Sequence, residues 1–393
     1  MVAGRPGRCW YPLNTLINAG WRIFSPGIFH LIQDHAMDIH KIFLPLVALT
    51  LALPHAAMAD GFRDTLDTPA RQSPFATKSL LNGVTTAGKR VVAVGQRGHI
   101  VYSDDAGKTW LQAQVPVSSD LVAVAFPTPE KGWAVGHDGV VLHSADGGTT
   151  WIRQLDGRSF GKIMTEFYTA QAAKGALGSS EAAAALIDES GRITGQGAEN
   201  SLLDVWFADA NNGFVVGAFN LIFHTADGGK TWESWYHRTA NPSRLHLYTI
   251  RQLGNELFIV GEQGMVQKLD AASGNFVALD TGYKGTFFGI TGSNGSVVVH
   301  GLRGHAFRSV DAGKSWQKIE TGLQDGITGS TTCGEKRLLL VSQAGKVLLS
   351  DNVGESFRPV KLDQAVPASA VACLGSDLGI VVGPRGVHAQ AIQ

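Results

Sequence analysis

Cysteine is scarce in this chain, and its few cysteines follow no metal-binding pattern. The 393 residues include three, Cys9, Cys333 and Cys373. None forms the closely spaced Cys or Cys/His pairs that zinc sites use. Cys333 and Cys373 lie 40 residues apart, so both a disulfide in an oxidising compartment and two separate thiols are open. We expect two buried thiols, because equivalent strands of neighbouring repeats can exceed the roughly 7 Å reach of a disulfide.

Net charge is also absent. Thirty-three basic residues balance 33 acidic ones, which excludes a general attraction to nucleic acid or to an anionic membrane. The glycine-rich turns are followed by strand patterns and not by helices, so they are not phosphate-binding loops. We therefore expect no metal, nucleotide or redox cofactor and no nucleic-acid partner.

A long apolar segment is missing too. The run Ile42–Leu53 has about 12 residues, which is short for a membrane span. It lies in residues 37–59, which have a basic start and end in Ala-Met-Ala, and this predicts a secretory signal peptide cleaved near Ala59. The alternative is an uncleaved anchor. We expect the protein in the periplasm or secreted. Residues 1–36 resemble no domain and are expected to be untranslated or removed.

What the chain does have is a repeated turn. The pattern S/T-x-D-x-G-x-S/T-W occurs at 103–110, 144–151, 225–232 and 309–316, and residues 350–357 keep it with Asn and Phe. We call this turn the Asp box. A degenerate copy at 268–276 ends in Phe276. With it included, four of the five intervals between the aromatic residues are 40 to 44 residues long, and one is 81. A period near 40 with strand-like content is typical of a β-propeller, with one four-stranded blade in each period.

A second signature, a β-branched run that ends in Val-Gly, gives the number of blades. The sequence predicts an all-β, seven-bladed propeller of four-stranded antiparallel blades over residues 60–393. The expected blades span 79–116, 119–155, 201–238, 245–280, 285–320, 325–360 and 367–393. The last blade lacks an Asp box and a fourth strand. Because open strand edges are a liability, we expect residues 60–78, within them 61–76, to close the ring as the missing outer strand.

The Asp boxes are expected to be structural. Their Ser, Thr and Asp side chains can bond nearby amides, the glycine tolerates positive φ, and the tryptophan can pack between blades. The residues concerned are Asp105, Gly107, Trp110, Asp146, Gly148, Trp151, Asp227, Gly229, Trp232, Asp311, Gly313 and Trp316. We expect none of them to be catalytic.

Residues 156–200 interrupt the period. They are rich in alanine, which favours helix, and they predict two helices near 161–175 and 179–188. A lost eighth blade is the alternative, which this composition disfavours. The insertion joins the last strand of blade 2 to the first strand of blade 3, so we expect it to hang over the face that carries the turns after Val-Gly.

Those turns, between the second and third strands, are the expected binding surface, because loops on a rigid scaffold carry function. Blades 1, 5 and 7 are each expected to present an arginine there, and arginine pairs well with carboxylates. The candidate partner-binding residues are Arg97, His137, Arg303, His305 and Arg385. The alternative is that these are ordinary solvated loop residues.

The repeat from Trp133 to Trp151 resembles the BNR/Asp-box propellers, and most of all the photosystem II stability/assembly factor family. The resemblance covers about 79–393 and implies a secreted, non-enzymatic propeller that assists assembly of a membrane complex, located in the thylakoid lumen if the cell is photosynthetic. We expect the protein to be a monomer. It also implies arginines on the propeller face, which Arg97, Arg303 and Arg385 match loosely. The insertion at 156–200 and the altered fourth Asp box depart from the family pattern. The partner is therefore expected to be photosystem II-like or another envelope complex, such as a transporter.

Two other functions remain open. Sialidase-like glycoside hydrolases share Asp boxes, and such hydrolysis needs two carboxylates across a cleft. Asp138 and Glu262 are the candidates, although they lie in different blades. A glycan- or peptide-binding propeller is the second alternative, with Phe219 and Trp206 as candidate apolar contacts.

Overall fold

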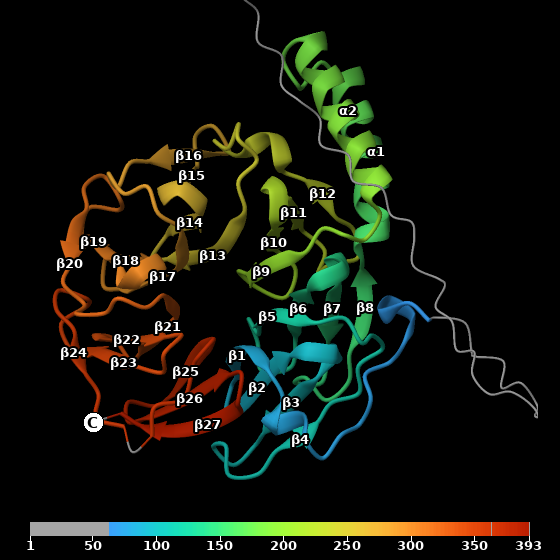
Figure 1. Cartoon of the computed structure of the whole chain (residues 1–393). Coiled ribbons are helices and arrows are strands. Elements are labelled where there is room, and N and C mark those ends of the chain that lie inside the picture. The colour runs from blue at the N-terminus through green and yellow to red at the C-terminus, as the bar shows by residue number, and fades with distance from the viewer. Residues whose placement is uncertain (1–62, 363, 393) are drawn as a thin grey trace, which may run out of the picture. The chain divides into compact units, whose positions relative to one another are not determined.

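The computed structural model describes residues 63–362 and 364–392. The predicted signal peptide (37–59) and upstream segment (1–36) lie outside these residues. In the described part, seven antiparallel sheets follow one another around a ring (Figure 1). The inner strand of each blade contacts the inner strand of the next, and β25 contacts β1, which closes the ring. The seven-bladed propeller is confirmed, with six four-stranded blades and a three-stranded last blade.

Each blade runs in chain order from the centre to the rim. Blade 1 consists of β1 (Leu81–Ala87), β2 (Arg90–Gly95), β3 (Ile100–Ser103) and β4 (Leu111–Gln112). Blade 2 consists of β5 (Leu121–Ala125), β6 (Gly132–Gly136), β7 (Val141–Ser144) and β8 (Ile152–Leu155). Blade 3 consists of β9 (Leu202–Phe207), β10 (Gly213–Gly217), β11 (Ile222–Thr225) and β12 (Glu233–Ser234). Blade 4 consists of β13 (Leu247–Leu253), β14 (Glu256–Gly261), β15 (Val266–Asp270) and β16 (Asn275–Leu279).

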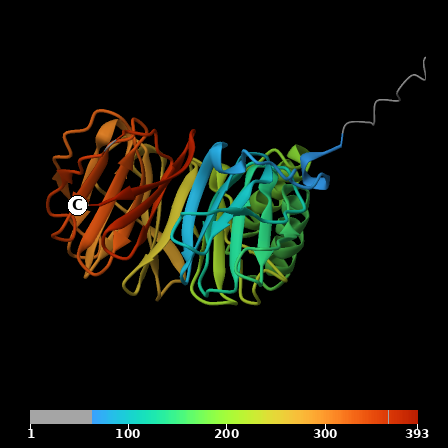
Figure 2. The same cartoon turned by 90° about the horizontal axis from the view of Figure 1, so that it is seen from below.

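The remaining blades repeat this order. Blade 5 consists of β17 (Phe287–Ser293), β18 (Ser296–Gly301), β19 (Ala306–Ser309) and β20 (Gln317–Ile319). Blade 6 consists of β21 (Ile327–Cys333), β22 (Arg337–Ser342), β23 (Val347–Ser350) and β24 (Arg358–Pro359). Blade 7 consists of β25 (Ala370–Leu374), β26 (Leu378–Gly383) and β27 (Gly386–Ala391). Figure 2 shows the blades from the side, with their turns gathered on two opposite faces.

The Val-Gly signature has a steric cause. A Cβ atom on Gly95 would overlap the carbonyl oxygen of Leu80, and one on Gly136 would overlap that of Asp120. In both blades the backbone that leads into the inner strand passes directly against the end of the second strand. Only glycine leaves room for this close approach.

Each Asp box is closed by its own side chains. Asp105 accepts hydrogen bonds from the Ser103 hydroxyl (2.8 Å), the Thr109 amide (2.8 Å) and the Thr109 hydroxyl (2.6 Å). The Ser103 hydroxyl also accepts from the Gly107 amide at 2.8 Å, and the Trp110 indole donates to the Gly107 carbonyl at 3.0 Å. Equivalent Asp contacts occur at Asp146, Asp227 and Asp311.

The boxes also join neighbouring blades. Gly148 of blade 2 approaches Val92 of blade 1, and Gly354 of blade 6 approaches Val298 of blade 5. Trp151 is 4% exposed, meets Phe126 of its own blade edge to face at 5.9 Å, and belongs to the same hydrophobic cluster as Val92 of blade 1. Each of these boxes therefore packs on the preceding blade, and it stabilises the ring as well as its own turn.

The predicted outer strand of blade 7 is wrong. Residues 63–78 form two single-turn 3-10 helices, Thr65–Asp67 and Ala76–Lys78, and no strand. The segment passes over blades 2 and 1 before it reaches blade 7. Its backbone bonds Val115 of blade 1, and its Asp67 pairs with Arg158 at 2.9 Å. Pro69 and Pro74 explain the failure, because proline lacks the N–H that a strand ladder needs.

The prediction of two separate cysteine thiols is also wrong. Cys333 at the end of β21 and Cys373 in β25 form a disulfide with their Cα atoms 5.5 Å apart. Both residues lie on inner strands, and the inner strands of successive blades are in contact. Equivalent positions near the ring centre are therefore within disulfide reach.

The insertion forms an antiparallel pair of helices, α1 (Phe160–Ala173) and α2 (Ser180–Gln196). Contrary to expectation, it packs against the outer edge of blade 3, beside β12, and does not hang over a face (Figure 1). The Tyr168 hydroxyl bonds the Ser234 hydroxyl at 2.9 Å, and burial raises the pKa of Tyr168 to about 12. No helix in residues 63–362 and 364–392 is long and apolar enough to cross a membrane.

Buried charges hold α2 to the propeller. Glu189, whose side chain is 4% exposed, pairs with Arg192 at 2.7 Å and with Arg244 at 2.9 Å. It also accepts a hydrogen bond from the Tyr236 hydroxyl at 3.1 Å. Arg244 and Tyr236 belong to the connection between blades 3 and 4, so this cluster fixes the insertion to a second segment of the chain.

Candidate functional site

The turns between second and third strands share one backbone conformation in five blades. Each is a single 3-10 turn, and its middle residue has a left-handed φ between 52° and 57°. The five middle residues are Arg97, Asp138, Phe219, Gln263 and Arg303. We call the face that carries these turns the B–C face, and the opposite face, with the Asp boxes, the box face.

The predicted partner-binding residues lie on the B–C face but do not form one cluster. Arg97, His137, Arg303 and Arg385 are exposed, whereas His305 is half-buried and stacks on Tyr283 at 4.9 Å. Arg303 and His305 line a shallow cavity of about 180 Å³ on blade 5. Arg385 lies in the two-residue turn between β26 and β27 and is not equivalent to Arg97 and Arg303.

A larger cavity, of about 550 Å³, occupies the centre of the ring, and it was not predicted from the sequence. Six of the inner strands carry a one-residue β-bulge near their start. The extra residues all line the cavity: Asn82, Val122, Leu203, Tyr248, Phe288 and Thr328. Bulges re-aim side chains, and here they set a ring of six side chains around the central axis.

The cavity opens on the B–C side. His137 and Gln343, which belong to B–C turns, also line it. We therefore call the cavity with its six bulge residues the channel mouth. Of the residues predicted to bind a partner, His137 is the one that belongs to it, while Arg303 and His305 line the separate cavity on blade 5.

The side chain of Arg251 faces the channel mouth. The Arg251 side chain is 38% exposed, and its Nη1 pairs with buried Asp204 and donates to the Ile250 carbonyl at 2.7 Å. Burial raises the pKa of Asp204, and the charge of Arg251 opposes that shift. The Tyr248 and Phe288 rings, which also line the cavity, meet edge to face at 5.7 Å. The mouth thus combines a fixed guanidinium with two aromatic rings, a combination suited to a carboxylate-bearing segment.

The buried histidine of the channel is structural. His300 bonds through both ring nitrogens, to the Ile327 carbonyl at 3.1 Å and the Ser330 hydroxyl at 2.8 Å. Burial lowers the pKa of His300 to about 4, so the ring is neutral near pH 7. Its partners fix its orientation.

The two carboxylates considered for glycoside hydrolysis both have structural partners. Asp138 accepts hydrogen bonds from Thr65 at 2.8 Å and Ser119 at 2.6 Å, which anchors the N-terminal segment. Glu262 accepts from the His246 amide at 2.8 Å. They belong to blades 2 and 4, and neither lines the channel mouth. In the part of the chain that the structure describes, no three His, Cys, Asp or Glu side chains are grouped to hold a metal ion.

A sequence signal for the channel mouth exists but was missed. Each bulge residue precedes the last residue of the following second strand by 13 or 14 positions. The residue types at these positions are mixed, from Asn82 to Phe288, so no repeat of chemistry draws attention to them. The signal is only the repeated position of these residues relative to the end of the second strand.

Comparison with known proteins agrees with this architecture. The model of the family described as photosynthesis system II assembly factor YCF48 matches residues 63–143, 104–165 and 192–321, which is more than half of the chain. A photosystem II assembly lipoprotein Ycf48 from Synechococcus sp. (strain CC9902) is 25% identical over 177 residues, 44% of this chain and 52% of that protein. The chain thus matches about half the length of this relative. A Prochlorococcus marinus protein of the same name is 54% identical over 35 residues, 9% of this chain and 10% of that protein.

Solved structures show the same fold. A structure described as YCF48 bound to D1 peptide has a TM-score of 0.59 at 14% identity, covering 82% of this chain and 96% of that one. YCF48 from Cyanidioschyzon merolae has a TM-score of 0.58 at 16% identity, covering 82% and 98%. With the propeller, its Asp boxes and the family match together, this chain belongs to the YCF48 family of photosystem II assembly factors.

Proposed function

We propose that this protein is a non-enzymatic assembly factor that acts outside the cytoplasm and binds a segment of a membrane-complex subunit at the channel mouth. The observation that carries the proposal is the ring of six bulge residues around a central cavity of about 550 Å³. A cavity of this size suits a chain end or a few side chains. The family membership and the relative described with a D1 peptide support a protein segment as the ligand.

The chemistry of the mouth suggests how such a segment binds. Arg251 offers a charge that Asp204 and the Ile250 carbonyl hold in place, so little side-chain entropy is lost on binding. Tyr248 and Phe288 offer apolar contact in the same cavity, and Gln343 offers a side-chain amide for backbone groups. A carboxylate at a chain end or on an acidic side chain is the group that this arrangement favours.

The exposed cations of the B–C face extend this surface. Arg97, His137, Arg303, His305 and Arg385 would contact parts of the partner around the mouth. The helical insertion, fixed through Glu189, adds a rim wall beside blade 3. We propose that the protein acts as a monomer and that its partner is photosystem II or a related envelope complex.

Export is the premise of this proposal. The signal-like segment 37–59 supports it, and the Cys333–Cys373 disulfide is consistent with an oxidising compartment. Cell fractionation followed by N-terminal sequencing tests it. The expected product begins at Asp60 and is found in the periplasm or lumen; a protein that begins before residue 37 and remains in the cytoplasm would contradict it.

Capture from solubilised membranes tests the binding site. The baits are the wild-type protein, Tyr248→Ala at the channel mouth, a triple variant with Arg97, Arg303 and Arg385 changed to glutamate, and Val310→Ala on the box face. Val310 is 64% exposed and serves as the matched control. A membrane subunit retained by wild type and Val310→Ala and lost by Tyr248→Ala supports the channel mouth. Retention by all four baits contradicts it.

A further inference from the structure

The open edge of blade 7 is a second surface that the proposed function does not use. β27 (Gly386–Ala391) pairs with β26, and no strand in the described ranges 63–362 and 364–392 pairs with its other edge. Every other blade has a fourth strand in this position. The second 3-10 turn of segment 63–78 (Ala76–Lys78) touches β27, but the segment forms no strand and does not fill the place.

The direction of the free backbone groups follows from the pairing. The Ile392 amide donates to the Asp377 carbonyl at 2.8 Å, and in an antiparallel pair alternate residues face the partner strand. Val387, Ala389 and Ala391 therefore turn their N–H and C=O groups away from β26. These three residues present a ladder of six backbone groups at the rim.

This edge lacks the features that protect other edges. The outermost strands of blades 1 to 6 are two to five residues long, and several contain charged residues or proline. β27 has six residues, GVHAQA, with no proline, no lysine and no bulge. Natural proteins usually prevent strand addition at such edges with charged residues, proline, bulges or a covering segment. The sequence of β27 contains no residue or bulge of this protective kind.

The charges near this edge indicate what would cover it. An added antiparallel strand would end beside Gly386, where β27 begins. Exposed Arg385 precedes Gly386, and the backbone of Lys78 lies against it. The C-terminal end of the added strand would thus meet basic residues. β27 itself contains no acidic residue, so the same edge of a second copy would not supply the complementary charge.

We propose that β27 binds an extended segment of a partner protein as the fourth strand of blade 7, with an acidic residue at the C-terminal end of that segment. Strand addition to an open sheet edge is a known recognition mode, in which main-chain hydrogen bonds provide affinity. This surface is on the rim and is distinct from the channel mouth. It gives the protein a second contact with its partner, or a contact with a second partner.

A peptide copied from one of the chain's own fourth strands serves as the probe. Residues 273–280, SGNFVALD, include β16 and end in Asp280. A labelled version is titrated into the purified protein as processed by the cell, and binding is followed by fluorescence anisotropy. Two backbone-methylated versions, blocked at alternate amides along one edge or along the other, are matched controls. A third control ends in lysine in place of Asp280.

The matching protein variants are Ala389→Pro and Ala389→Thr. Proline removes an outward N–H while the amides that bond β26 remain, and threonine keeps that N–H. We expect the peptide to bind wild type and Ala389→Thr, and to bind Ala389→Pro at least about tenfold more weakly. One methylated peptide should lose binding while the other keeps it, and the lysine peptide should bind more weakly. Equal binding to all three proteins, or none to wild type, overturns the proposal.

Hydrogen exchange and the oligomeric state distinguish a partner segment from two other possible occupants of this edge, another part of the chain and a second copy. The amides of Val387, Ala389 and Ala391 should exchange quickly in the protein alone and slowly with the peptide. Slow exchange of these amides in dilute protein alone would mean that another part of the chain covers the edge. A dimer that forms with rising concentration and is lost in Ala389→Pro would assign the edge to a second copy. Either result overturns the proposal.

Discussion

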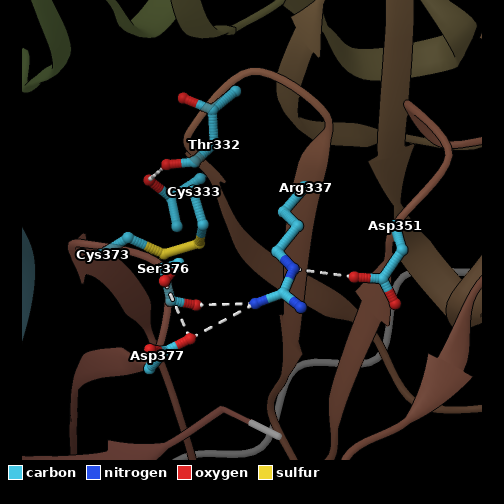
Figure 3. The surroundings of a disulfide bond; sticks show 8 residues. Thr332, Cys333, Arg337, Asp351, Cys373, Ser376 and Asp377 are labelled. Atoms are coloured by element: carbon cyan, nitrogen blue, oxygen red, sulfur yellow. Dashed lines mark hydrogen bonds and ion pairs between the residues drawn. A yellow bond between two sulfur atoms is a disulfide. The ribbon is translucent and has the colours of Figure 1, made fainter.

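Cys333 and Cys373 join the inner strand of blade 6 to the inner strand of blade 7 (Figure 3). Elsewhere in the ring, as at Gly148 and Gly354, the box of one blade packs on the preceding blade. The described part of blade 7 has no such box to pack on blade 6, and the disulfide links the two blades at their inner strands. Arg337 of blade 6 adds a second tie, since its Nη1 donates to the Ser376 carbonyl of blade 7 at 3.1 Å.

Loss of this disulfide is expected to lower the stability of the ring. It closes a 40-residue loop, for which restriction of the unfolded chain contributes roughly 2–4 kcal/mol. The double variant Cys333→Ser, Cys373→Ser should therefore have a free energy of unfolding lower by that amount, and its denaturation midpoint should lie at a lower denaturant concentration. Wild type measured in reductant is the control and should match the variant. If wild type had equal denaturation midpoints with and without reductant, the disulfide would not stabilise the ring. If two free thiols could be titrated in the unfolded protein without reductant, the disulfide would not be formed.

The Asp boxes should make the fold sensitive to acid. Hydrogen bonds from the Thr109 hydroxyl and amide lower the pKa of Asp105 to about 2, and the pKa values of Asp146, Asp227 and Asp311 are lowered as well. A carboxyl group with a depressed folded-state pKa stabilises the fold above its unfolded pKa of about 4 and loses that contribution as pH falls through the folded value. Melting temperature should therefore drop between about pH 4 and pH 2.

A natural comparison is present in blade 6. Asn352 occupies the Asp position there, and its amide donates to the Ser356 hydroxyl at 2.9 Å. Asn352→Asp should add to the acid-sensitive part of the stability curve, and Asp105→Asn should reduce it. Parallel pH profiles for both variants and wild type would show that the boxes do not carry this dependence.

Val353 is in a strained backbone conformation. The fourth residue of the box has a left-handed φ, which is 55° at Val353, 60° at Ala106 and 58° at Ala312. A β-branched residue disfavours this region by about 1–3 kcal/mol. Val353→Gly should raise the free energy of unfolding by about 1 kcal/mol after the entropy of glycine is subtracted. Ala312→Gly, the control, should gain less. A destabilised Val353→Gly protein in chemical denaturation would refute this account.

The Glu189 cluster should fix the helical insertion. Glu189→Gln removes the charge that Arg192 and Arg244 contact, and buried ionic contacts of this kind cost about 1–3 kcal/mol to break. Amide exchange in α2 should become faster, while exchange in the distant blades 5 to 7 stays unchanged. Tyr236→Phe, which removes one hydrogen bond, should have a smaller effect. Unchanged exchange in α2 for both variants would mean that apolar packing alone holds the insertion.

Sequence patterns predicted the propeller because its repeats are local. The Asp box fits within eight residues, and its bonds join residues two to four positions apart, as between Asp105 and Thr109. Three features were beyond such patterns. The proximity of Cys333 to Cys373 depends on the narrow centre of the ring, and the path of 63–78 depends on Pro69 and Pro74. The bulge residues share a position in the repeat but no residue type, so a search for repeated chemistry does not find them.

The central claim is that a membrane subunit occupies the channel mouth. The most direct test places a photo-crosslinking amino acid at Tyr248, or at Val310 on the box face, in the intact producing cell. The account predicts a crosslink to a membrane-complex subunit from position 248 and none from position 310. No crosslink from position 248, or the same subunit captured equally from position 310, would contradict it.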